Sequence, residues 1–162
     1  MIVISIPNSI YKEVVSVGGI VYREIHDQQE IVVCGHSNSD SYHLPKGTPE
    51  LRETREETAL REVQEETGLE TEILDFVGKI NYYFEHPKDK KKYKKTVFFY
   101  LMKPIGGDFS LHDEEFDFVK WMKVEEIFNM LTHSNEVDIV QKGLSLVKSG
   151  SKRTSDCRIE RG

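Results

Sequence analysis

Three glutamates share one face of a predicted helix, at a spacing suited to holding a metal ion. Glu62, Glu65 and Glu66 stand at positions i, i+3 and i+4, so on a helix their carboxylates lie on one face within about one turn. Like charges this close repel one another, and we therefore expect a cation among them. Because all the ligands are oxygens, a hard ion such as Mg2+ or Mn2+ is favoured over zinc.

The surrounding residues predict the helix that must carry these carboxylates. An apolar face repeats at every fourth residue, namely Ala59, Val63 and Thr67, and is expected to pack inward. Thr54 followed by Glu57 is typical of a capping box at the start of the helix, and Gly68 is typical of its end.

The loop ahead of this helix brings a lysine and a glycine next to the acidic face. Lys46 precedes Gly47 there, and a cation beside a metal site can hold phosphate oxygens that the metal also touches. A backbone carbonyl of the loop could also ligate the metal. The alternative is that Lys46 is an ordinary surface lysine.

The whole segment resembles the Nudix box, G-x5-E-x7-R-E-U-x-E-E-x-G-U with U an aliphatic residue. Every defined position is filled, by Gly47, Glu53, Arg61, Glu62, Val63, Glu65, Glu66, Gly68 and Leu69. An acidic, solvated helix is the simpler interpretation, but it does not explain so many fixed spacings. The resemblance implies metal-assisted hydrolysis of a nucleoside diphosphate linked to another moiety.

The resemblance also implies roles for individual residues of the box. Glu62, Glu65 and Glu66 would bind divalent ions, and the backbone at Lys46 or Gly47 would complete the coordination. Glu53 and Arg61 would hold the loop and the helix in register. The general base is either Glu62 or Glu115, which resembles a downstream glutamate of several relatives. Glu114 and Glu115 face opposite ways on a strand, so only one can reach the site; alternatively, both are solvent charges.

Apolar and β-branched runs predict the remaining elements. Strands are expected at residues 14–22, 30–34, 71–84, 96–102 and 115–124, and helices at 124–131 and 136–147. This order resembles the Nudix α/β/α sandwich, an α/β fold with a mixed sheet. Gly18 and Gly19 lie in mid-strand and suggest either a bulge or a close backbone approach.

Aromatic and basic residues beyond the box give two further hypotheses. Tyr82, Tyr83 and Phe84 could stack a nucleobase, although core and cross-strand packing is the commoner role of such residues. Six lysines crowd residues 88–95, and we favour a solvated hairpin tip over a loop that contacts polyphosphate. His43 and His86 lack spaced partners, so packing or solvent-facing roles are expected.

Within the family, the likeness is greatest to bacterial diadenosine polyphosphate hydrolases. It rests on four short matches in order, at residues 16–21, 44–47, 82–83 and 95–97. One departure is that many relatives carry Pro-Gly where this chain has Leu51 and Arg52, which leaves substrate contacts from that loop open.

Length, charge and cysteine content indicate the domain organisation, the partners and the compartment of the protein. The 162 residues suit one domain, at residues 1–148, followed by a polar and flexible tail at 149–162. A net charge of −6 argues against general nucleic-acid binding. Cys34 and Cys157 imply no disulfide framework, which fits a cytoplasmic protein, and the short apolar start predicts neither a signal peptide nor a membrane span. A monomer or a homodimer is expected.

We therefore predict an Mg2+-dependent pyrophosphohydrolase whose substrate is a dinucleoside polyphosphate such as diadenosine tetraphosphate. The box does not distinguish this from a nucleoside triphosphate or nucleotide-sugar (ADP-ribose type) pyrophosphatase. A third alternative is a Nudix-like sensor that binds a nucleotide without turnover, although a pure binder needs no water-activating carboxylates.

Overall fold

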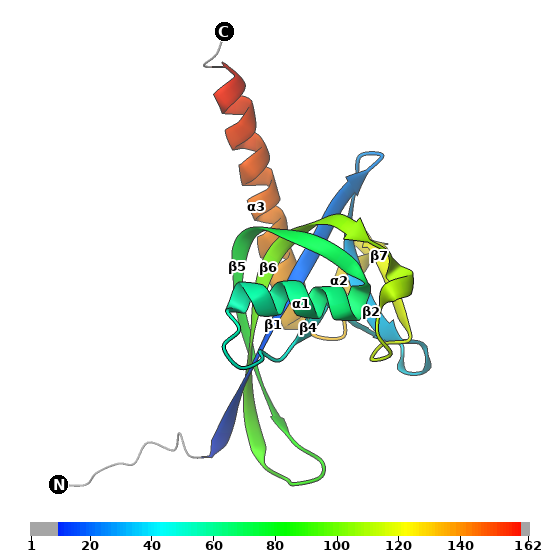
Figure 1. The fold of residues 1–162 in the computed structure, drawn as a ribbon, viewed down its shortest axis with the longest axis vertical. Coiled ribbons are helices and arrows are strands. Elements are labelled where there is room, and N and C mark those ends of the chain that lie inside the picture. Colours follow the sequence, from blue (N-terminus) through cyan, green and yellow to red (C-terminus); the bar gives the residue numbers. More distant parts are fainter. Residues whose placement is uncertain (1–9, 160–162) are drawn as a thin grey trace, which may run out of the picture.

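One mixed sheet carries a helix on one face and two helices on the other (Figure 1). The computed structural model describes residues 10–159, with side chains for residues 10–149. The strands are β1 (Tyr11–Ile25), β2 (Gln28–His36), β3 (Ser41–His43), β4 (Lys46–Gly47), β5 (Leu69–Glu85), β6 (Lys92–Gly107) and β7 (Phe118–Lys123). The helices are α1 (Arg55–Thr67), α2 (Val124–Met130) and α3 (Ser134–Ile159), with short 3-10 turns η2 (Ser37–Ser39) and η3 (Phe109–Leu111).

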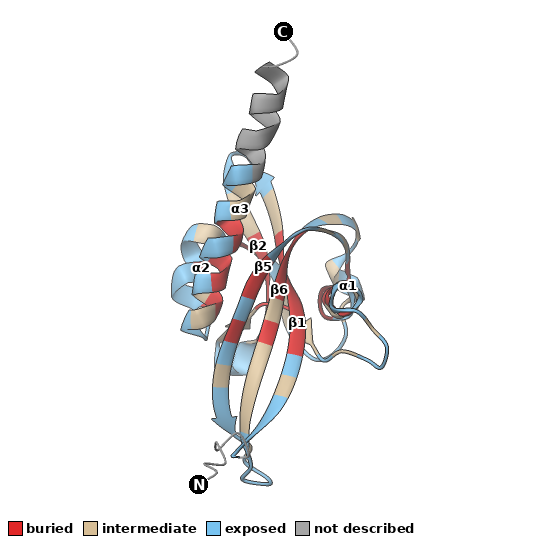
Figure 2. Ribbon diagram, turned by 90° about the vertical axis from the view of Figure 1, so that its left-hand side faces the viewer, coloured by how far each residue is buried: buried red, intermediate tan, exposed pale blue. Residues whose placement is uncertain are grey.

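The sheet is mixed because β1 and β6 run parallel while the other pairs are antiparallel. Its main order is β3-β2-β1-β6-β5, and β4 pairs with β1 while β7 pairs with β2. The expected α/β/α sandwich is confirmed, since α1 lies on one face of the sheet and α2 and α3 lie on the other (Figure 2).

Alternation along the central strand divides the core between the two faces. Val17 and Val21 of β1 pack with Ala59 and Val63 of α1, whereas Ile20 packs in a second cluster that includes Val140 of α3. Successive side chains of a strand point to opposite faces, so one apolar strand contributes to both clusters. All six of these side chains are fully buried, and the packing of the first cluster fixes α1 against the sheet.

Helix α1 begins and ends as its sequence predicts. The Thr54 hydroxyl accepts from the Glu57 N–H at 3.1 Å, and the Glu57 carboxylate accepts from the Thr54 N–H at 3.0 Å. Gly68 ends the helix in the left-handed region, with φ of 79°, where glycine carries no steric cost. The expected inward face is confirmed, because Ala59, Val63 and Thr67 are fully buried.

The two mid-strand glycines serve a close backbone approach. A Cβ on Gly18 would lie 2.2 Å from the Pro45 carbonyl oxygen, and the Gly19 N–H donates to that same oxygen at 3.1 Å. The β1–β6 register runs without a shift through both glycines, so the bulge is not found. The glycines thus allow the segment containing Lys46 and Gly47 to lie directly on β1.

Several element boundaries differ from the sequence predictions. β7 starts at Phe118, so Glu115 lies in the preceding loop, and the strand alternation invoked for Glu114 and Glu115 does not apply. α3 continues past residue 147 to Ile159, which places the start of the expected tail inside a helix; residues 160–162 and the apolar start at 1–7 lie outside the described residues. Within the described part, no helix has the length and apolarity needed to cross a membrane.

A three-stranded ribbon projects from the body of the fold (Figure 1). It consists of residues 11–15 of β1, 81–85 of β5 and 92–96 of β6, which pair in register. The lysine-rich turn is its tip and extends away from α1. This position agrees with a solvated hairpin tip and does not bring the tip over the acidic helix.

Candidate active site

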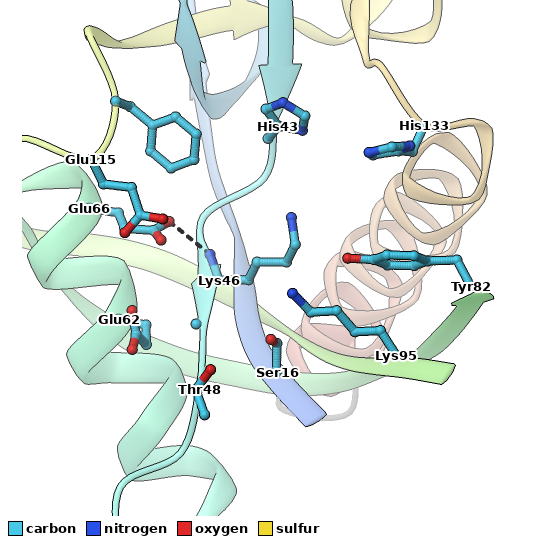
Figure 3. A pocket seen from close by; sticks show the side chains of 12 residues that line it. Ser16, His43, Lys46, Thr48, Glu62, Glu66, Tyr82, Lys95, Glu115 and His133 are labelled. Carbon is cyan, nitrogen blue, oxygen red and sulfur yellow. Dashed lines mark hydrogen bonds between the residues drawn. The ribbon is translucent and has the colours of Figure 1, made fainter. Parts of the chain in front are cut away.

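A cavity of about 420 Å³ lies between helix α1, the paired strands β1 and β4, and the loop that leads into α3. Figure 3 shows the side chains that line it. They are Ser16, His43, Lys46, Thr48, Glu62, Glu66, Tyr82, Lys95, Glu115, Phe116 and His133, together with Gly47. The structure thus brings together residues that are far apart in the sequence and gives the cavity an acidic side and a basic side.

The acidic side consists of Glu62, Glu66 and Glu115 (Figure 3). Glu66 is only 2% exposed, and its carboxylate accepts from the Lys46 N–H at 2.9 Å. Burial, and then the charges of Glu115 and Glu62, raise the pKa of Glu66 to about 8. Burial also raises the pKa of Glu62. The carboxylates therefore repel one another in a poorly solvated environment, and a bound cation would offset this repulsion.

Gly47 is required by the position of Glu62. A Cβ at residue 47 would lie 2.0 Å from the carboxyl carbon of Glu62 and 2.1 Å from Oε2. Only glycine lets the backbone of β4 pass this close to the carboxylate. The backbone of Gly47 and the side chain of Glu62 are therefore adjacent, as the ligand set implied by the box requires.

Arg61 joins the loop before α1 to the helix itself. Its Nε donates to Glu53 Oε2 at 2.6 Å, and its Nη2 donates to Glu53 Oε1 at 2.8 Å. Nη2 also donates to the Thr48 carbonyl at 3.0 Å. Arg61 hydrogen bonds, with those from Thr58 and the Glu50 backbone, lower the pKa of Glu53 to about 2. A two-pronged ion pair of this kind fixes orientation as well as charge.

The same arginine holds two of the predicted metal ligands. Its Nη1 donates to Glu62 Oε1 at 2.9 Å and to Glu65 Oε2 at 3.2 Å. The Glu65 side chain is 47% exposed and does not line the cavity. Arg61, Glu53 and Glu65 thus stand behind the cavity wall.

The donor set is suited to a hard divalent cation. Three carboxylates line one cavity beside the Gly47 backbone, and the pKa of two of them is raised by burial and mutual repulsion. Among the described side chains, at residues 10–149, no three acidic, histidine or cysteine groups already stand at metal-binding distances from one another. Arg61 holds Glu62 through Oε1, so Oε2 would be the oxygen offered to a cation.

The basic side contains two lysines that point into the cavity (Figure 3). Burial acts to lower the pKa of Lys46, but Glu136 and other acidic neighbours raise it overall. The Lys46 ammonium donates to Glu136 Oε1 at 3.2 Å. Burial and the charge of Lys46 lower the pKa of Lys95. Two ammonium groups facing carboxylates across one cavity can bind the anionic oxygens of a phosphate chain.

Rings line the basic side as well. The Tyr82 and His133 rings stack with centroids 5.8 Å apart and an interplanar angle of 13°, and His43 lies 5.6 Å from His133. Burial and the Lys46 charge lower the pKa of His43 to about 4. Tyr83 lies on the opposite face of β5, is 59% exposed and contacts Tyr11. The structure therefore brings Tyr82 to the cavity and leaves Tyr83 outside it.

Several residues that line or support the cavity were not identified from the sequence. The sequence placed Lys95 in the lysine run and in the short match at residues 95–97, and Glu136 at the start of a helix, without giving either a role in the site. A buried glutamate in the first turn of α3 gives no local sequence signal, because its partner Lys46 is 90 residues away. His133 and Phe116 reach the cavity from loops whose paths depend on the whole fold.

Comparison with known proteins agrees with the resemblance to the Nudix box. The NUDIX domain model matches residues 12–141. A Mycobacterium tuberculosis protein named "Putative mutator protein MutT4" is 38% identical over 75% of this chain and 50% of its own length. The "8-oxo-(d)GTP phosphatase" of Mycolicibacterium smegmatis is 29% identical over 70% of this chain and 33% of its own length. The chain thus spans half or less of these two relatives.

A solved structure of a C. elegans Ap4A hydrolase binary complex superposes with a TM-score of 0.65 at 19% identity, covering 84% of this chain and 98% of that one. The NUDIX domain of Shewanella oneidensis NrtR, solved with ADP ribose, superposes with a TM-score of 0.66 at 15% identity, over 85% and 92% of the two chains. At these identities the likeness extends to the fold alone.

Proposed function

Because the chain belongs to the NUDIX domain family, we propose that it is a metal-dependent pyrophosphohydrolase that cuts a phosphoanhydride bond of a nucleotide. One observation carries the proposal: a single cavity has carboxylates on one side and lysines and rings on the other. Phosphate chains attached to a base need both kinds of surface. A cavity that bound only an anion would gain nothing from three carboxylates.

Glu62, Glu66 and Glu115 would hold the divalent cation, with the Gly47 backbone beside them. We extend the same role to Glu65, which reaches the metal only if it leaves Arg61. Once bound, Mg2+ or Mn2+ supplies charge neutralisation of the phosphates and activation of the attacking water.

The chain's own groups would perform the remaining tasks. Lys46 and Lys95 would hold the oxygens of the phosphate chain, and Tyr82 would lie against the base or ribose. Glu53 and Arg61 keep the loop and α1 in register, so that the two sides of the cavity face each other. Glu115, which reaches the cavity from a loop, or Glu62 would accept the proton of the attacking water.

For the substrate we propose a dinucleoside polyphosphate such as diadenosine tetraphosphate, following the short sequence matches to hydrolases of that class. The second candidate is a nucleoside triphosphate, which the name of the Mycolicibacterium smegmatis relative, "8-oxo-(d)GTP phosphatase", favours.

A hydrolysis panel tests the proposal. The purified protein is incubated with Mg2+ or Mn2+ and with diadenosine tetraphosphate, dGTP or ADP-ribose in 18O-labelled water, and the products are identified by mass spectrometry. We expect metal-dependent turnover, fastest with diadenosine tetraphosphate, and incorporation of 18O into one product phosphate. Faster turnover of dGTP would select the second candidate, whereas tight binding without turnover of any compound would support a sensor.

A further inference from the structure

Six rings form a continuous row that leads from the cavity out along the projecting ribbon. The row runs through His43, His133, Tyr82, Phe84, Tyr93 and His86. The centroid distances between successive rings are 5.6, 5.8, 6.2, 5.2 and 6.1 Å. The first three rings line the cavity, and the last three lie beyond it.

Strand register places the outer rings on the same face as the cavity. Tyr82 pairs with Lys95 and Phe84 pairs with Tyr93 across β5 and β6. Lys12 of β1 pairs with Tyr93. Because side chains two residues apart share a face, the row that holds Lys12, Tyr93 and Phe84 continues the cavity floor by about 7 Å.

The outer rings are partly open to solvent: Phe84 is exposed, and Tyr93 and His86 are half-buried. The start of α3 covers the ribbon only as far as Tyr82, where His133 stacks and where Asn135 Nδ2 donates to the Asn81 carbonyl at 3.2 Å. Phe84, two residues further, is 37% exposed, and its ring stacks on Tyr93 at an interplanar angle of 12°. A partly exposed pair of stacked rings therefore lies directly beyond Tyr82, which lines the cavity.

Positive charges flank these rings. Lys95 Nζ lies 5.9 Å from the Tyr82 ring centroid, and Lys12 is exposed on the same face. Aromatic faces combined with ammonium groups bind stacked bases and the phosphates attached to them. Cross-strand packing that merely braces the ribbon is the simpler explanation of the ring contacts, but it does not require lysines or a connection to the cavity.

We propose that Phe84 and Tyr93 form a second ring-binding subsite, which takes the base at the far end of the substrate's phosphate chain. This inference rests on the proposed function and defines its substrate class as nucleotides with a second nucleoside beyond the phosphates. A nucleoside triphosphate ends at its last phosphate and has no group to place on this subsite.

Binding of a two-ended and a one-ended nucleotide tests the subsite. Kd values for diadenosine tetraphosphate and for ATP are measured by calorimetry with Ca2+, and chromatography confirms that each ligand stays intact. In Phe84→Leu and Tyr93→Leu we expect the Kd of diadenosine tetraphosphate to rise about tenfold and that of ATP to change less than about twofold. Leucine retains apolar packing but removes the ring face.

Tyr11→Leu is the matched control, because Tyr11 is 38% exposed on the opposite face of the same ribbon, and it should change neither Kd. Thermal melting of each variant checks that the ribbon is folded. Equal changes for both ligands, no change for either, or a wild type that binds neither would overturn the subsite. Failure of the proposed function would look different. The wild type would not hydrolyse the nucleotides with Mg2+, yet Phe84→Leu would still change the ratio of the Kd for diadenosine tetraphosphate to the Kd for ATP.

Discussion

Lys46 and Glu136 form a buried ion pair that connects the cavity to the start of α3. The two charged groups are 3.2 Å apart, and the Glu136 side chain is 1% exposed. Glu136 also accepts from the Leu44 N–H at 3.4 Å. One carboxylate thus holds both the lysine that points into the cavity and the backbone that leads to it.

Removing Glu136 should destabilise the protein and impair catalysis. Glu136→Ala leaves the Lys46 ammonium without its buried partner, so we expect a loss of about 3 kcal/mol in the free energy of unfolding and a lower kcat/KM. Urea denaturation and steady-state kinetics measure these changes. The double variant Lys46→Met, Glu136→Met should regain stability without regaining activity; a double variant as unstable as Glu136→Ala would show that the pair is not the cause.

Gly47→Ala should impair activity far more than stability. The new Cβ would meet the Glu62 carboxylate, which is the free end of a flexible side chain and can move aside. Since a displacement of about 1 Å can cost about a hundredfold in rate, we expect a drop of that order in kcat with little change in Tm.

Gly106→Ala is the control for this change. A Cβ there would also meet a glutamate, with Glu70 Oε2 at 3.0 Å, but outside the cavity. Similar kinetics for the two alanine variants would contradict the role given to the Gly47 and Glu62 contact.

Glu115 and Glu114 offer a comparison of adjacent carboxylates. Glu115 lines the cavity and Glu114 does not. We expect Glu115→Gln to lower kcat by about a hundredfold or more, as loss of a group that moves a proton or binds the metal does, and Glu114→Gln to stay within about twofold of wild type. If both variants keep full activity, the two residues are solvent charges.

His43 should make stability depend on pH in a defined window. Its folded pKa is lowered from 6.5 to about 4, mainly by burial, so between these values the unfolded chain binds a proton that the folded chain does not. The contribution of His43 to stability is therefore lost as pH falls from about 6.5 to about 4. As pH falls across this range, Tm should drop more steeply for wild type than for His43→Asn; parallel curves would be inconsistent with a half-buried, neutral imidazole.

The sequence predicted the local parts of this molecule well, for a physical reason. The capping box of Thr54 and Glu57, the stop at Gly68 and the inward face of α1 depend on residues within a few positions of one another. The strand expected at residues 14–22, which lies within β1, likewise follows from a local run of β-branched and apolar residues. Each of these features was found where it was expected.

The remaining features depend on contacts between distant segments. The two explanations for Gly18 and Gly19, a bulge or a backbone contact, are distinguished only by the close approach of Pro45. The partner of Lys46 likewise lies far away in the sequence, on α3. Glu115 reaches the cavity from a loop rather than from a strand, because β7 begins only at Phe118. Pattern reading could identify Tyr82 and Tyr83 as candidates, but only the strand register distinguishes the face that meets the cavity.

The central claim is that the carboxylates of the cavity enable hydrolysis of a phosphoanhydride, and Glu66 tests it most directly. Its carboxylate is buried at the cavity wall and accepts from the Lys46 N–H, so Glu66→Gln retains the shape while removing the group that can ionise and bind the cation. The measurement is the Mg2+-dependent rate of diadenosine tetraphosphate hydrolysis by wild type and by Glu66→Gln. The Tm of each protein is measured as well, to confirm that the two are equally stable. We predict a fall in kcat of about 10²- to 10³-fold; a variant as fast as wild type would contradict the account.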